Sequence, residues 1–164
     1  MTEHKDGIET ALTRRAFCVH ACEAVSLAAL GAVLHGCGGS SPTSPSAGAD
    51  APALPTINAS VAGNVISLTI DAASALASVG AAALVRASNG MFLVSRTGQS
   101  AFTALTAICT HEGCTITGFR SPTYVCPCHG SQYSTSGTVI TGPATTSLRQ
   151  FAAQFNNVVL TIAT

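Results

Sequence analysis

Two short stretches, CTHEGC at residues 109–114 and CPCHGS at residues 126–131, together hold four cysteines and two histidines. The sequence contains no other cysteine or histidine after Cys37, so every such side chain of that part gathers in these two stretches. Thiolate and imidazole are ligands that zinc and iron–sulfur clusters prefer. The two stretches therefore predict one metal site, and the fold has to bring them together.

A structural zinc ion is one candidate for this site. It would take four of the six side chains into a closed tetrahedron and leave two cysteines over. In an oxidising compartment these two would pair as a disulfide. The residue count alone therefore leaves open a second interpretation, in which the protein binds zinc and has no redox function. Together with a lipid anchor, this would be a zinc-binding, non-redox lipoprotein.

The order of the six side chains resembles the Rieske family, in which histidines replace two cysteines on one iron of a 2Fe–2S cluster. The family pattern is Cys-x-His followed by Cys-x-x-His, and residues 109–111 and 126–129 contain both halves. The resemblance covers about residues 105–145 strongly and the flanking strands only in general pattern. It implies one 2Fe–2S cluster, with the metal ligands Cys109, His111, Cys126 and His129.

Further residues have roles that the resemblance implies. Cys114 and Cys128 correspond to the disulfide that joins the two cluster loops in the high-potential branch of the family. Ser131 and Tyr133 match a serine and a tyrosine that donate hydrogen bonds to sulfur. Such donors stabilise added negative charge, so they are expected to raise the reduction potential.

The resemblance also extends to the loop that shields the cluster in this family and to the residue at the exposed tip of the first cysteine loop. Gly142 and Pro143 resemble the proline-containing loop that shields the cluster, although Gly-Pro is also a common turn. Glu112 departs from the quinol-oxidising members, which usually carry an apolar residue at their docking tip. Since an unpaired carboxylate is costly to bury in an apolar pocket, this departure argues against quinol oxidation by that docking mode.

Residues 1–36 predict an export signal. They combine a polar start, the pair Arg14-Arg15 and an apolar run of small residues, which is the pattern of a twin-arginine signal. His20 and Glu23 interrupt the run, and a membrane span needs about 20 apolar residues, so no stable span is expected. The twin-arginine route carries folded proteins, which suits a cluster that is inserted before export. The protein is therefore expected outside the cytoplasmic membrane.

Cys37 and the residues after it predict an anchored domain on a linker. The stretch LHGC at residues 34–37 resembles a bacterial lipoprotein cleavage site, which implies a lipid on Cys37. Residues 37–57 are rich in Gly, Ser, Pro and Ala and contain too few large apolar groups to fold, so a flexible linker is expected. The folded Rieske-like domain is then residues 58–164, with the cluster-binding part at about residues 106–144.

Short alternating runs with turn signals between them predict an all-β domain. Residues 82–87 and 91–97 flank the turn Ser88-Asn89-Gly90 and predict a hairpin, and residues 148–156 and 158–162 predict a final one. Other expected strands are residues 64–71, 101–108, 115–119, 131–133 and 138–140. The resemblance to the Rieske family implies that these strands form small antiparallel sheets or a sandwich, with a cluster-binding subdomain of two loops.

Composition and residue count narrow the function. Only 9% of the residues are charged and the formal net charge is zero, which excludes the basic face of a nucleic-acid binder. Apart from His111 and His129, no histidine after Cys37 remains to build the mononuclear iron site of a Rieske oxygenase, so catalysis by the chain alone is not expected. The expected function is single-electron transfer between redox partners, such as a cytochrome or a membrane oxidoreductase. The alternative is the iron–sulfur subunit of a quinol–cytochrome c oxidoreductase or of an arsenite-oxidase-like complex.

Overall fold

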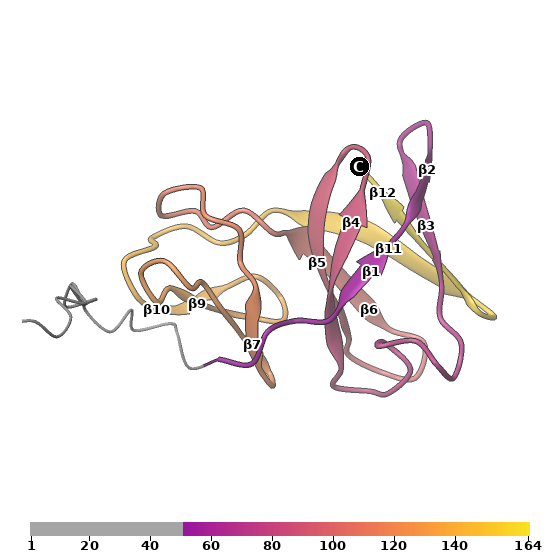
Figure 1. Ribbon diagram of the computed structural model, residues 1–164, viewed down its shortest axis with the longest axis horizontal. Coiled ribbons are helices and arrows are strands. Elements are labelled where there is room, and N and C mark those ends of the chain that lie inside the picture. The colour runs from indigo at the N-terminus through magenta and orange to yellow at the C-terminus, as the bar shows by residue number, and fades with distance from the viewer. Residues whose placement is uncertain (1–50) are drawn as a thin grey trace, which may run out of the picture. The chain divides into compact units, whose positions relative to one another are not determined.

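The computed structural model describes residues 51–164, which form β-strands joined by loops (Figure 1). The strands belong to an eight-stranded sheet and a four-stranded sheet. Between residues 51 and 164 there is no helix of the length and apolarity that a membrane span requires. The prediction of an all-β fold is confirmed, whereas the export signal and Cys37 lie outside the described residues.

The larger sheet begins and ends with strands that are consecutive in the chain. Its order is β1 (Thr56–Asn58), β4 (Ala82–Ala87), β5 (Gly90–Arg96), β6 (Phe102–Thr106), β11 (Gln150–Asn156), β12 (Val159–Ala163), β3 (Val65–Thr69) and β2 (Ser60–Ala62). Only Ala59 separates β1 from β2, so one extended segment pairs with β4 at one end of the order and with β3 at the other. This segment closes the larger sheet into a barrel-like wall.

Strands β4, β5 and β6 are buried on both faces, because alternate residues of each strand point to opposite sides of the sheet. Leu84, Leu93 and Leu105 face a core that is shared with the smaller sheet. Val85 and Val94 face a second core inside the larger sheet. Burial on both faces explains why these strands read as nearly continuous apolar runs rather than as a strict polar–apolar alternation.

The smaller sheet places the two cysteine-containing loops at the same end. Its order is β10 (Val139–Thr141), β9 (Gln132–Ser134), β8 (Thr123–Val125) and β7 (Gly118–Arg120), and all of its pairs are antiparallel. The first loop precedes β7 and the second connects β8 to β9. Since β7 and β8 are antiparallel neighbours, the start of β7 lies beside the end of β8, and both loops emerge there (Figure 1).

Both predicted hairpins are confirmed as β4–β5 and β11–β12, with a change in the first turn. Ala87 pairs with Gly90, so the turn residues are Ser88 and Asn89, and of the Asn-Gly pair only Gly90 has a positive φ (152°). In the second turn Asn157 adopts the left-handed conformation (φ 55°), which asparagine tolerates better than most residues. The three-residue strands β7, β9 and β10 overlap the strands expected at residues 115–119, 131–133 and 138–140, whereas β1, β2 and β8, which have the same length, were not predicted.

Candidate metal centre

Loop 1, residues 109–114, is closed by backbone hydrogen bonds between its own ends. Cys109 N donates to Cys114 O at 2.8 Å, and Gly113 N donates to Cys109 O at 2.9 Å. Gly113 has a φ of 75°, a left-handed conformation that glycine adopts without steric penalty. Loop 1 is therefore a tight turn that holds the Cys109 side chain at its base.

Loop 2, residues 126–131, repeats the backbone of loop 1. Cys126 N donates to Ser131 O at 2.8 Å, Gly130 N donates to Cys126 O at 3.1 Å, and Gly130 has a φ of 73°. The two loops thus share the same start, the same glycine position and the same closing bonds. The common backbone explains how two unrelated stretches of sequence present their first cysteines in equivalent ways.

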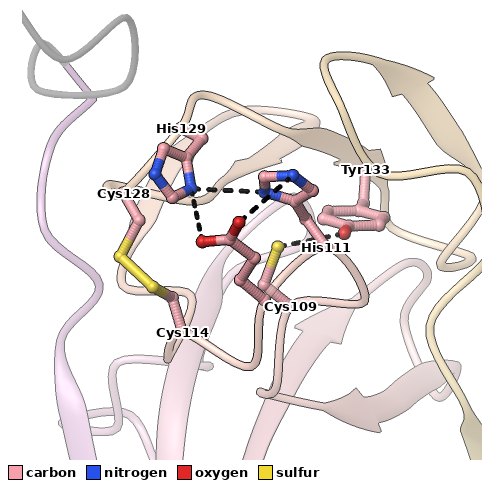
Figure 2. Close-up of a disulfide and its surroundings, with 7 residues drawn as sticks. Cys109, His111, Cys114, Cys128, His129 and Tyr133 are labelled. Carbon is pink, nitrogen blue, oxygen red and sulfur yellow. Dashed lines mark hydrogen bonds and ion pairs between the residues drawn. A yellow bond between two sulfur atoms is a disulfide. The ribbon is translucent and has the colours of Figure 1, made fainter.

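A disulfide between Cys114 and Cys128 joins the two loops, as the resemblance implies for the high-potential branch. It runs from the end of loop 1 to the middle of loop 2, and its Cα atoms are 6.6 Å apart (Figure 2). Two sulfur atoms of the six-residue set are thereby used in a covalent bond. The remaining cysteines, Cys109 and Cys126, are both unpaired and buried.

The surroundings affect these two thiols differently. Burial raises the pKa of Cys126, and the neighbouring Cys109 thiol raises it further. Burial also acts to raise the pKa of Cys109, but hydrogen bonds from the Tyr133 hydroxyl and the His111 backbone amide outweigh it, so this pKa lies below that of an ordinary thiol. Cys109 is therefore the thiol whose anionic form the protein stabilises more.

The two histidines lie at the exposed tip of the loops and face each other. His111 Nδ1 and His129 Nδ1 are 3.2 Å apart, and their ring centroids are 4.9 Å apart (Figure 2). Their side chains are 27% and 48% exposed. Glu112 reaches both rings, with 3.8 Å between Oε1 and His111 Nε2 and 3.7 Å between Oε2 and His129 Nδ1. The centre thus has sulfur inside and imidazole at the surface.

Tyr133 connects the buried thiol to loop 1. Its hydroxyl oxygen is 3.2 Å from Cys109 Sγ and 3.0 Å from Thr110 Oγ1, and it accepts a hydrogen bond from Thr110 N at 3.2 Å. The Thr110 hydroxyl donates its own proton to Thr146 O at 2.6 Å. The phenolic proton of Tyr133 therefore has two acceptors, and negative charge on sulfur favours Cys109, because hydrogen bonds to ionised acceptors are stronger.

Ser131 holds residues 142–144 against loop 2. Its buried hydroxyl accepts a hydrogen bond from Ala144 N at 3.2 Å, and it also helps to lower the pKa of Cys109. A Cβ atom at Gly142 would lie only 2.5 Å from Ser131 Cα, and Gly142 has a φ of 102°. Because residues 142–144 pack directly on loop 2, only glycine fits at position 142 without displacing the backbone.

The described donor atoms do not form one closed zinc site with both sulfur and imidazole ligands. Within residues 51–164 the groups of three or more His, Cys, Asp or Glu side chains whose possible ligand atoms all lie within 4.8 Å of one another are Cys114 with Cys126 and Cys128, and His111 with Glu112 and His129. No such group in that part of the chain joins sulfur to imidazole. A tetrahedral zinc site needs its donors about 3.5 Å apart, since its bonds are about 2.0–2.3 Å long. Separate sulfur and nitrogen pairs fit two irons with different ligands.

The fold and this centre define a small β-domain with a buried thiol pair and an exposed imidazole pair, a donor set that fits a two-iron cluster. The chain belongs to the Rieske [2Fe-2S] domain family, whose family model matches residues 68–152. Its cofactor is one 2Fe–2S cluster, and it is a Rieske electron-transfer protein.

The chain is similar to curated relatives and to a solved structure. The cytochrome b6-f complex iron-sulfur subunit of Prochlorococcus marinus strain MIT 9301 is 46% identical over 57 residues, which is 34% of this chain and 32% of that protein. The subunit of the same name from Chlorobaculum thiosulfatiphilum is 42% identical over 55 residues, 33% of this chain and 30% of that protein. The chain thus spans about a third of the length of these curated relatives. The cyanobacterial plasma membrane Rieske protein PetC3 from Synechocystis PCC 6803 is 28% identical, with a TM-score of 0.46 over 51% of this chain and 86% of that structure.

The structure brings all the side chains singled out in the two loops to one end of the smaller sheet, with Tyr133 beneath them. The sequence did not single out Thr110, which contacts both Tyr133 and Thr146. Nor did it indicate that Glu112 reaches both imidazoles. Apart from the contact of Glu112 with its neighbour His111, these contacts join residues 17 to 36 positions apart, so no local pattern could have pointed to them.

Proposed function

We propose that this protein carries single electrons between redox partners on the outer side of the cytoplasmic membrane. In this proposal Cys109 and Cys126 hold the inner iron, and His111 and His129 hold the outer iron. The observation that supports this proposal is the arrangement of the candidate ligands, with the thiols buried and the imidazoles exposed. The exposed rings give the shortest route for an electron from a docked partner.

The remaining residues of the centre have supporting roles. The bound cluster supplies one-electron chemistry, and the chain determines where the charge is stabilised and how water is excluded. Tyr133 and Ser131 donate toward sulfur and favour the reduced state. The disulfide between Cys114 and Cys128 limits the separation of the loops, and Gly142 with Pro143 covers one side.

Metal analysis tests this proposal directly. Protein that is purified without oxygen is expected to contain about two irons and two sulfides per chain, as the Rieske cluster requires. After reduction it is expected to give the electron paramagnetic resonance signal of a 2Fe–2S cluster with mixed sulfur and nitrogen ligands. Stoichiometric zinc without sulfide would overturn the proposal.

The cellular location of the protein is part of the same proposal. Residues 1–36 act as a twin-arginine signal, Cys37 carries a lipid, and residues 37–57 link the anchor to the domain at residues 58–164. Support comes from the sequence pattern and from relatives named as subunits of a cytochrome b6-f complex and as a plasma membrane Rieske protein. Mass spectrometry of the mature N-terminus tests it, and an unmodified start after Cys37 would refute lipidation.

A second candidate is a permanent subunit of a membrane oxidoreductase, either of the quinol–cytochrome c type or of the arsenite-oxidase type. The names of the relatives favour a partner within a membrane complex. Glu112 opposes the quinol-oxidising form, because its side chain is 61% exposed at the tip, where an apolar docking pocket would have to bury it. Co-purification from solubilised membranes separates the candidates, since a permanent subunit is recovered with its complex.

We expect the Tyr133→Phe variant to have a lower reduction potential than the wild-type protein. The substitution removes the hydroxyl that lies 3.2 Å from Cys109 Sγ. A hydrogen bond to a charged group contributes about 1.5–3 kcal/mol. For a one-electron couple this corresponds to a decrease of about 65–130 mV. Redox titration of the visible spectrum measures the change.

Tyr124→Phe is the matched control for this variant. Tyr124 is buried in the same core, and its hydroxyl has no hydrogen bond to either thiol. Its removal is expected to leave the potential within about 10 mV of the wild-type value, since no donor to sulfur is lost. Equal potentials in wild-type and Tyr133→Phe protein would exclude a tuning role for Tyr133.

We expect the Glu112→Gln variant to have a higher reduction potential than the wild-type protein. The carboxylate lies within 3.8 Å of both imidazoles, so its negative charge disfavours an added electron. A pair of charges 4 Å apart in water interacts by about 1 kcal/mol, and the carboxylate is exposed, so a rise of about 20–40 mV is expected. The control is Asp71→Asn, which removes a carboxylate from the loop after β3. A rise in both variants, or in neither, would contradict the local effect of Glu112.

A further inference from the structure

The segment at residues 51–54 forms an additional edge of the smaller sheet. Leu54 N donates to Thr117 O at 2.7 Å, and Phe119 N donates to Pro52 O at 2.9 Å. Ala53 forms an antiparallel bridge with Gly118 between these two bonds. Figure 1 shows this segment running beside β7 before it enters β1. The domain boundary that was predicted between residues 57 and 58 thus falls after a stretch that is already paired.

The segment packs closely against Gly118, where there is no room for a larger side chain. A Cβ atom at Gly118 would lie 2.9 Å from Ala51 Cβ and 3.0 Å from Val125 O. Leu54 is 7% exposed and belongs to the same core as Cys109 and Cys126. The segment is therefore fixed by two backbone bonds, one buried side chain and one close backbone approach.

The partner of the segment continues directly into loop 1. Thr117, which accepts the bond from Leu54, is three residues from the disulfide cysteine Cys114. Between them Ile116 N donates to Ala107 O at 2.8 Å, and Thr115 forms a bridge with Ile108. A displacement of residues 51–54 thus reaches the base of loop 1 through a short, continuous hydrogen-bonded path.

The attachment is also small enough to open without unfolding the domain. Pro52 and Ala53 are exposed, and Leu54 is the only buried side chain of residues 51–54. Edges with few buried contacts open more readily than central strands do.

We propose that residues 51–54 are a latch that attaches the linker to the cluster-binding sheet. With the latch closed, the linker ends at the edge of β7. When it opens, four residues are released, and the reach of the domain increases by about 13 Å, because an extended chain spans about 3.3 Å per residue. Opening also removes the support of loop 1. The functional meaning of this added reach rests on the proposed role as a tethered electron carrier.

Hydrogen exchange of the full-length, cluster-loaded protein tests the latch. The amides of Leu54 and Phe119 donate the two latch bonds, whereas the amide of Cys126 donates within loop 2. In the wild-type protein we expect the two latch amides to exchange at least about tenfold faster than the Cys126 amide, because local opening exposes only the former. Equal protection of all three amides would overturn the latch.

Two leucine variants separate latch opening from general destabilisation. Leu54→Ala removes the buried anchor, while Leu148→Ala removes a leucine of the same core, 4% exposed, that lies outside the latch. We expect Leu54→Ala to raise exchange at Phe119 at least about tenfold relative to Leu148→Ala, and to speed the loss of visible absorbance in air several-fold. Equal exchange at Phe119 in the two variants would refute the proposal.

This experiment is independent of the proposed electron-transfer role. Iron content and the paramagnetic signal report whether the cluster is present, and exchange at Leu54 and Phe119 reports only the latch. A cluster-loaded protein that transfers electrons but protects these amides as strongly as Cys126 would overturn the latch alone. Selective opening in a protein that never accepts an electron would leave the latch valid and overturn the proposed function.

Discussion

Protein with the Cys126→Ser substitution is expected to be purified without visible colour and with less than about a tenth of the wild-type iron. Cys126 is buried at the base of loop 2, beside the Cys109 thiol. A serine hydroxyl is not ionised there, and soft thiolates are the ligands that iron–sulfur clusters require. The bond from Cys126 N to Ser131 O does not involve the side chain, so loop 2 is expected to keep its backbone. Iron and sulfide analysis with visible spectroscopy measures the loss.

Cys37→Ser is the matched control, because it exchanges the same two residue types outside the proposed ligand set. Expressed without residues 1–36, it is expected to retain the full iron content. Circular dichroism then shows whether the colourless variant is still a β-domain. A folded Cys126→Ser protein with two irons per chain would contradict the assignment of this ligand.

The ligand loops could be predicted because their information is local. Cys-x-His and Cys-x-x-His each lie within four residues, and a glycine at the same place in each loop permits the same tight turn. The structure adds the equivalence of their closing hydrogen bonds. It also adds the separation of sulfur from imidazole, which argues against a closed zinc site with both kinds of ligand. The match to the Rieske [2Fe-2S] domain family then favours the iron–sulfur cluster over the zinc alternative that residue counts had left open. Distances between donors in different loops are a property of the fold.

The long hairpins could be predicted for the same reason, whereas only half of the three-residue strands were predicted. β4 with β5 and β11 with β12 are neighbours in sequence, so a turn between two apolar runs was enough. Strand β8 is three residues long, and its partner β9 follows an entire ligand loop. The pairing of Ala53 with Gly118 spans most of the domain. Contacts of this kind depend on which faces are buried together, which the sequence alone does not display.

Removal of the disulfide by the double substitution Cys114→Ser and Cys128→Ser is expected to lower the free energy of unfolding by about 3 kcal/mol. The bond closes a chain segment with a sequence separation of 14 residues. Cross-linking a loop of about 15 residues lowers the entropy of the unfolded chain by an amount equivalent to about 3 kcal/mol. For a domain of this size the melting temperature is expected to fall by about 10 °C. Urea titration of the cluster-free protein gives the free energy without a contribution from bound metal.

The same double variant is expected to lose the cluster faster than the wild-type protein does. With the bond between Cys114 and Cys128 absent, loop 1 and loop 2 are no longer joined covalently except through the main chain of β7 and β8. The remaining contacts between them are non-covalent, such as those of His111 and Glu112 with His129. Separation of the loops admits water to the buried thiols, so absorbance in air is expected to decay at least about tenfold faster, in line with about 3 kcal/mol of lost constraint. Both serines are needed, because a single substitution leaves a third thiol that could replace Cys109 or Cys126 as a ligand. Equal decay rates in the double variant and the wild-type protein would show that the two loops hold the cluster without their covalent link.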